Sequence, residues 1–259
     1  MKKNTQLALY GVGAVGAALG LTLLLTRRAA AAPATPRQIR LLPSSLVIGI
    51  PEDDSPCTSD PTLIWGAAVL QAFADSIGAD RIEAQALPAI LRQAILGQSP
   101  GIIYLYGHGN PTVYTCEDCL VFFLSDGLNL DLVAGKYVHL CSCDTAQDLG
   151  YKIVGAGAKG YFGYWDTFLC MGKVRPGSGR YVNAPFTCDI EIEVALLSGS
   201  TDLKAIYDRA VARLNDEIAY WQENWEKESC DGVKVVEVEA QMLISCLIHN
   251  REALRYYSA

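Results

Sequence analysis

Two cysteines stand one residue apart at the end of an apolar run in VHLCSCDTA (138–146). A disulfide between Cys141 and Cys143 would be strained, because the preferred Cβ separation is hard to reach across a single residue. The pair therefore serves packing, metal binding or nucleophilic chemistry. A cysteine becomes a useful nucleophile when a base or a cation holds it as a thiolate that a substrate can reach.

The base for such a cysteine would have to come from three histidines. His108 lies in YGHGN, between two glycines just past an apolar run, whereas His139 lies within a strand and His249 in the last helix, where both are expected to be structural. Gly109 lets the backbone approach a substrate carbonyl, and the N–H groups of Gly109 and Cys143 could together form an oxyanion hole. The pattern favours a dyad of His108 and Cys143.

These residues need strands that end at one edge of a sheet. Apolar runs expected to be strands alternate with segments of helical pattern, the strands at 46–50, 101–109, 136–143 and 160–165 and the helices at 63–77, 88–96 and 145–155. This alternation of apolar strands with helices predicts an α/β fold with a mainly parallel central sheet flanked by helices. Functional residues of such sheets lie at the carboxyl ends of strands, where His108 and Cys143 both fall.

The remaining segments are less regular. The stretch 111–135 has hairpin character, and apolar residues recur at helical spacing over 202–225. Ser200 or Thr201 can cap this helix. Residues 230–232 are expected to form a turn and 236–257 a closing helix.

The order strand–HG, hairpin, strand–CxCxTA, helix and GAGAKGYFGYWD resembles the CHAT peptidases of the caspase-like cysteine protease clan. The family's motifs correspond to HGN (108–110), LCSCDTA (140–146) and GAGAKGYFGYWD (155–166), and the segment 196–214 is similar to its closing helix. The resemblance covers most of residues 46–215. It implies a caspase-like three-layer sandwich and cysteine endopeptidase activity, with His108 as the base and Cys143 as the nucleophile. Such chemistry needs no metal or organic cofactor.

The resemblance also bears on substrate specificity. It implies that the residue two before the nucleophile, Cys141, lines the pocket for the substrate residue that precedes the cut. Many relatives that prefer basic substrates carry Asp at that position, and this chain has a thiol. An anionic partner for Arg or Lys would instead come from other acidic residues, namely Glu52, Asp53, Asp54, Asp144 and Asp166.

A second pair of cysteines, Cys116 and Cys119 in TCEDC, has the spacing of a zinc knuckle. Zinc prefers four ligands, and a second CxxC is missing from the sequence. A disulfide or plain loop thiols are therefore favoured over metal. The alternative to a peptidase is an inactive binding or scaffold module on the same fold, with zinc or a disulfide in this loop.

The N-terminus predicts a membrane segment. Residues 7–25 are uncharged and mostly apolar, which is about the length that crosses a bilayer as a helix. Arg27 and Arg28 separate this run from the small residues that follow, which favours a retained anchor over 1–28 rather than a cleaved signal peptide and a secreted protein. Residues 29–45 are rich in Ala and Pro and read as a linker. The peptidase domain then spans 46–259, with a helical segment from about 200.

Charge and cysteine content limit the partners and the location. The net charge of −7 gives no basic footprint, so nucleic acid is not an expected partner. The expected partners are a protein or peptide substrate and the membrane, and the oligomeric state is open. Arginines after the apolar run favour a cytoplasmic domain, whereas nine cysteines suit an oxidising compartment, so the side of the membrane also stays open.

Overall fold

A computed structural model describes residues 45–50, 70, 74–75, 80–85, 88–116, 119–171 and 179–259 of the chain. The expected membrane segment and residues 29–44 of the expected linker lie outside these residues, as does most of the helix expected over 63–77. Ser45, expected to end the linker, is the first residue of β1. Among the helices that are described, none has the length and apolar character needed to span a membrane.

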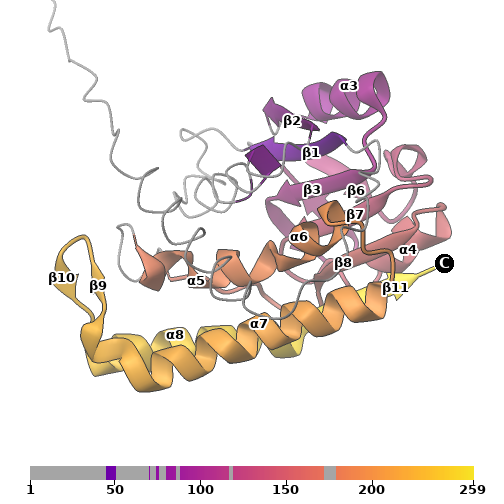
Figure 1. The fold of residues 1–259 in the computed structure, drawn as a ribbon. Helices are drawn as coiled ribbons and strands as arrows, with labels where there is room; N and C mark the ends of the chain where they lie inside the picture. The colour runs from indigo at the N-terminus through magenta and orange to yellow at the C-terminus, as the bar shows by residue number, and fades with distance from the viewer. Residues whose placement is uncertain are drawn as a thin grey trace, which may run out of the picture. The chain divides into compact units, whose positions relative to one another are not determined.

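The domain is built on a six-stranded sheet with the order β11-β8-β7-β3-β1-β2 (Figure 1). The strands are β1 Ser45–Ile50, β2 Asp80–Gln85, β3 Ile102–Tyr106, β7 Tyr137–Cys141, β8 Gly160–Tyr164 and β11 Leu254–Ser258. Five of them run parallel, and β11 pairs antiparallel with β8. The prediction of a mixed α/β fold with a mainly parallel sheet is thus confirmed.

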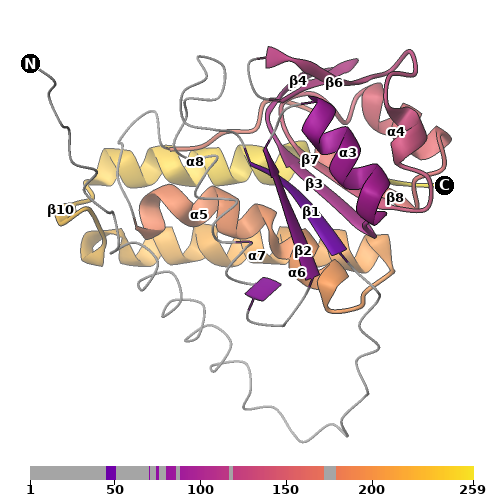
Figure 2. The same ribbon diagram turned by 90° about the horizontal axis from the view of Figure 1, so that it is seen from above.

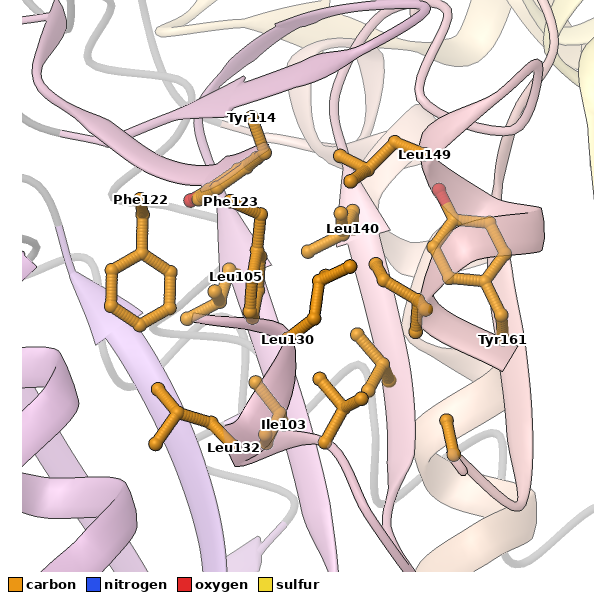
Figure 3. Close-up of a cluster of buried hydrophobic side chains, with 14 of the residues drawn as sticks. Ile103, Leu105, Tyr114, Phe122, Phe123, Leu130, Leu132, Leu140, Leu149 and Tyr161 are labelled. Carbon is orange, nitrogen blue, oxygen red and sulfur yellow. The ribbon is translucent and has the colours of Figure 1, made fainter. Parts of the chain in front are cut away.

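The three strands β3, β7 and β8 are buried at every residue, because helices contact both faces of the sheet. One face carries Ile103, Leu105 and Leu140, which pack against α3 (Pro88–Gln98) and α4 (Leu149–Gly155). Figure 3 shows this cluster, which also takes in aromatic residues from the small sheet described below. The opposite face carries polar side chains that meet α5 (Arg180–Asp189) and α6 (Glu191–Leu197).

The two longest of the described helices, α7 (Leu203–Asn224) and α8 (Glu237–Ala253), pack against each other and against α5 (Figure 2). Their shared core contains Trp221, Leu214 and Leu243, all nearly or fully buried. A hairpin of β9 (Ser229–Cys230) and β10 (Val233–Lys234) joins them, after the short 3-10 helix η3 (Trp225–Lys227).

A separate antiparallel sheet follows β3 and consists of β4 (His108–Asn110), β5 (Val113–Thr115) and β6 (Val121–Leu124). The 3-10 helix η2 (Leu130–Leu132) leads from it to β7. This sheet and the β9–β10 turn confirm the hairpin character of 111–135 and the turn at 230–232.

Several boundaries differ from the sequence-based expectation. The helix expected from Thr145 begins at Leu149, because residues 144–148 form a turn. The N-cap of α7 is Asp202, whose side chain accepts a hydrogen bond from the Ala205 N–H at 3.1 Å, so the expectation of Ser200 or Thr201 was wrong. The closing helix ends at Ala253, and the residues after it extend along β8 as β11.

Candidate active site

The two loops that carry His108 and Cys143 leave neighbouring strands at the same edge of the sheet. β3 and β7 are adjacent and parallel, with Tyr106 paired to Cys141 at their carboxyl ends. Immediately after β3, the Gly107 N–H donates to the Cys141 carbonyl at 3.4 Å. His108 follows on β4 and is exposed, while Cys143 is half-buried. The topology therefore brings both predicted site residues to one end of the sheet.

The two loops approach each other closely at Gly109. A Cβ atom built on Gly109 would lie 2.5 Å from Thr145 Cγ2 and 2.6 Å from the Cys143 carbonyl oxygen. Real Cβ atoms do not approach a backbone oxygen so closely, so no other residue type fits without a shift of the Cys143 loop. Glycine is thus required here by close backbone approach.

The pairing of β4 with β5 indicates where the Gly109 N–H points. Asn110 and Val113 flank a two-residue turn and form the pair closest to it. Hydrogen-bonded and non-hydrogen-bonded pairs alternate in antiparallel sheets. Because Asn110 and Val113 are the hydrogen-bonded pair next to the turn, Gly109 and Tyr114 form a non-hydrogen-bonded pair. The N–H of Gly109 therefore points away from β5.

The Cys143 thiol meets residues from the segment that follows β8. Burial raises the pKa of Cys143, whereas hydrogen bonds from the backbone of Phe168 and the side chain of Thr167 lower it, and the carboxylate of Asp144 raises it further. The net direction is upward. Cys143 therefore rests as a thiol, and a base has to remove its proton when it reacts.

The turn after Cys143 is held to the same segment. Asp144 adopts a left-handed conformation with φ of 59°, and its N–H donates to the Asp166 carbonyl at 3.3 Å. Gln147 Nε2 bridges the Asp144 carboxylate at 3.1 Å and the Trp165 carbonyl at 2.8 Å. Asp166 is exposed, and its carboxylate accepts from the Thr167 N–H at 2.7 Å. Asp144 and Asp166 thus both lie near Cys143.

The other acidic candidates, Glu52, Asp53 and Asp54, lie outside the described residues. Cys141 behaves differently from the expected pocket wall: it is 1% exposed, and its thiol hydrogen-bonds to Asp189. Burial and this carboxylate raise its pKa well above the usual value. In this structure Cys141 belongs to the interior, and it offers no surface that a substrate could contact.

Beneath Cys141 lies a buried polar cluster that sequence reasoning did not find. His139 on β7 stands between two carboxylates, with Nδ1 2.8 Å from Glu193 Oε1 and Nε2 3.2 Å from Asp189 Oδ1. The latter contact is an ion pair without hydrogen-bond geometry. Tyr104 and Tyr164 each donate a hydroxyl to Asp189 at 2.5 Å.

The charges in this cluster depend on one another. Burial alone would lower the pKa of His139, but the carboxylates of Asp189 and Glu193 raise it to about 10. Burial raises the pKa of Glu193 to about 7 in spite of His139. Asp189 has a lowered pKa although it is buried, because His139 and the tyrosine hydroxyls favour its charged form. The cluster is electrically neutral when Glu193 carries a proton.

The CxxC pair is divided between two roles. Cys119 is disulfide-bonded, while the Cys116 thiol donates to the Leu120 carbonyl at 3.4 Å. Over the described part of the chain, no group of three or more His, Cys, Asp or Glu side chains is arranged to hold a metal ion. A zinc site that uses both thiols would have to replace the disulfide of Cys119.

No family model matches the sequence, and no curated protein matches it either.

Proposed function

We propose that the protein is a membrane-anchored cysteine endopeptidase in which His108 and Cys143 form the catalytic dyad. The observation that carries this proposal is the close packing of the His108–Gly109 backbone on the loop of Cys143, where a single added carbon would overlap a backbone oxygen. This packing places a histidine and a cysteine on touching loops at the carboxyl end of a parallel sheet. The membrane anchor is proposed from residues 7–25 alone.

The reaction would proceed through an acyl-enzyme. His108 takes the thiol proton as the Cys143 sulfur attacks the peptide carbonyl carbon, and an S–C bond forms. The negative oxygen would be stabilised by the N–H groups of Gly109 and Cys143. The C–N bond then breaks, and His108 returns the proton to the leaving amine. Water, deprotonated by His108, attacks the thioester and releases the acid and the free thiol.

The raised pKa of Cys143 fits a dyad that needs a base during the reaction rather than a preformed ion pair. The backbone of Phe168 and the side chain of Thr167 lower the pKa of this thiol, so they would favour the thiolate once the proton has left. His108 is exposed, so a substrate that covers it would also exclude water from the dyad.

The experiment that tests this proposal is labelling of the full-length protein with a panel of peptide acyloxymethyl ketones. We expect wild type and Cys141→Ala to be labelled, and Cys143→Ala and His108→Ala to lose the label. Cys141→Ala is the matched control, because it removes a buried thiol two residues away. Labelling that persists in Cys143→Ala and disappears in Cys141→Ala would reverse the assignment.

The second candidate is an inactive binding or scaffold module on the same fold. The observation that favours it is the disulfide of Cys119, which would stabilise a loop without any role in catalysis. A folded wild-type protein that reacts with no peptide probe would support this candidate. Metal analysis would then distinguish a disulfide-stabilised loop from one that holds near-stoichiometric zinc.

A further inference from the structure

The segment after β8, residues 165–169, is fixed to the last helix of the domain. The Trp165 N–H donates to the Ala253 carbonyl at 2.8 Å, and His249 Nε2 lies 2.9 Å from the Thr167 carbonyl oxygen. Asn250 makes two bonds to one residue: its Oδ1 accepts from the Leu169 N–H at 2.9 Å, and its Nδ2 donates to the Leu169 carbonyl at 2.8 Å. The end of α8 thus holds this segment at three points along its length.

The opposite side of the same segment faces the nucleophile. The Asp166 carbonyl accepts from the Asp144 N–H at 3.3 Å, and the Trp165 carbonyl accepts from Gln147 Nε2 at 2.8 Å, so the segment is joined to the turn after Cys143. The side chain of Thr167 and the backbone of Phe168 act on the Cys143 thiol in the direction that lowers its pKa. Residues 165–169 therefore connect α8 with the sulfur. The two donors that favour the thiolate lie immediately before Leu169, the residue that Asn250 holds.

Asn250 is unusual within its helix. It is 1% exposed and lies on the buried side of α8, which also carries Ala240, Leu243, Ile244, Cys246, Leu247 and Ala253. The Cys246 thiol donates to the Leu169 carbonyl as well, at 3.0 Å. A buried amide costs free energy unless it is hydrogen-bonded, so an apolar residue would pack here more favourably if packing were the sole requirement. The two bonds to Leu169 satisfy the amide, and they fix the main chain in both directions.

We propose that Asn250 is a positioning residue for the nucleophile: by holding both main-chain groups of Leu169, it keeps Thr167 and the Phe168 N–H facing the Cys143 sulfur. The inference rests on the proposed role of Cys143. With this role for Asn250, the C-terminal helix α8 would contribute to the site, although it lies beyond the part of the chain that resembles the peptidase family.

The test is the pH dependence of Cys143 alkylation by iodoacetamide in the full-length protein, measured by mass spectrometry of the peptide that carries this residue. Asn250→Ala removes both bonds to Leu169. We expect the midpoint of its alkylation profile to rise by about one pH unit, which slows alkylation roughly tenfold below the midpoint. In Cys143→Ala the alkylated form of this peptide should be absent, which shows that the measured signal comes from Cys143.

The matched control is Leu243→Ala, a truncation of a fully buried residue of the same helix that belongs to the core shared with α7. It is expected to lower the thermal midpoint without moving the alkylation profile. If Leu243→Ala shifts the profile as much as Asn250→Ala, the effect is one of general stability and the positioning role is wrong.

A second variant covers the case in which Asn250→Ala fails to fold. Asn250→Gln keeps the amide but carries it about 1.5 Å further from the helix, so both bonds cannot persist in place. A smaller shift in the same direction is expected, and a profile identical to wild type would overturn the inference. Alkylation needs no peptide substrate. A protein that cleaves no peptide but shows these shifts would therefore refute the proposed function alone.

Discussion

Gly109→Ala is a substitution for which the structure leaves no room between the two loops of the candidate site. The new Cβ would lie 2.6 Å from the Cys143 carbonyl oxygen and 2.5 Å from Thr145 Cγ2. Comfortable contacts begin near 3.5 Å, so one loop has to move by about 1 Å. Thr145 is fully buried and hydrogen-bonded to Ser142 and Tyr161, which leaves little room for its side chain to withdraw. The backbone of the His108–Gly109 loop or of the Cys143 loop therefore has to move, which changes the distance between His108 and Cys143.

The expected cost has two parts. Overpacking of this size destabilises a folded protein by about 1–3 kcal/mol. A shift of about 1 Å between reacting groups lowers the rate by about two orders of magnitude. Activity should consequently fall much further than stability.

The assay compares the rate of labelling by a peptide acyloxymethyl ketone with the free energy of unfolding in urea. Gly97→Ala is the matched control: nothing lies within 4 Å of its new Cβ, and it should stabilise α3 by about 0.5–1 kcal/mol. A Gly109→Ala protein with wild-type stability and wild-type labelling would show that the two loops do not pack as described, and the proposed dyad would lose its main support.

Three further predictions concern stability. Asp189→Asn should destabilise the fold by about 3–5 kcal/mol in urea unfolding, because it leaves His139 with a buried charge that is less well compensated; a loss below about 1 kcal/mol would contradict the ion pair. Stability should fall as pH rises from about 5 to 7, because the raised pKa of Glu193 makes the folded state bind a proton that the unfolded state releases. Stability should continue to fall at higher pH because of His139. The raised pKa of His139 stabilises the fold fully below about pH 6.5, and this contribution is lost as pH rises through about 10. Relative to Glu193→Gln, wild type should lose about 2 kcal/mol between pH 5 and 7, and parallel curves would refute this. Cys119→Ser should lower the thermal midpoint and abolish its response to dithiothreitol, because the disulfide of Cys119 is then gone. A Cys119→Ser protein that still responds to the reductant would show that another bond is being reduced.

The strands that form the centre of the sheet could be predicted from the sequence, because a strand buried on both faces is a continuous apolar run. This holds for β3, β7 and β8, and β1 is likewise an apolar run in the sequence. In contrast, β2 has the sequence DRIEAQ and lies at the edge, paired with β1 alone. Polar residues at alternate positions give it no apolar run. β11 was missed because its residues continue the helical pattern of α8, and its pairing with β8 decides its conformation.

The site divides in the same way. The positions of His108 and Cys143 followed from local signals, namely glycines and strand ends. The setting of Cys141 did not, because its partner Asp189 is 48 residues away (189 − 141) in a helix that gave no recognisable signal. His139 was expected to be structural, and its burial between two carboxylates agrees with that. The identity of those carboxylates depends on how α5 and α6 pack, which a local pattern does not contain.

The pairing of β8 with β11 has a consequence for how the chain folds. These two strands are neighbours in the sheet but are separated by 90 residues from Tyr164 to Leu254 (254 − 164), and the α-helices described between them are α5, α6, α7 and α8. Contacts of such large sequence separation form late, since the loop they close must be ordered first. Until then β8 has an open edge, which favours association between chains. The segment that faces Cys143 also lacks its attachment to α8 at that stage, so the candidate site should be completed in the last folding phase, after the bulk of the helical signal has appeared.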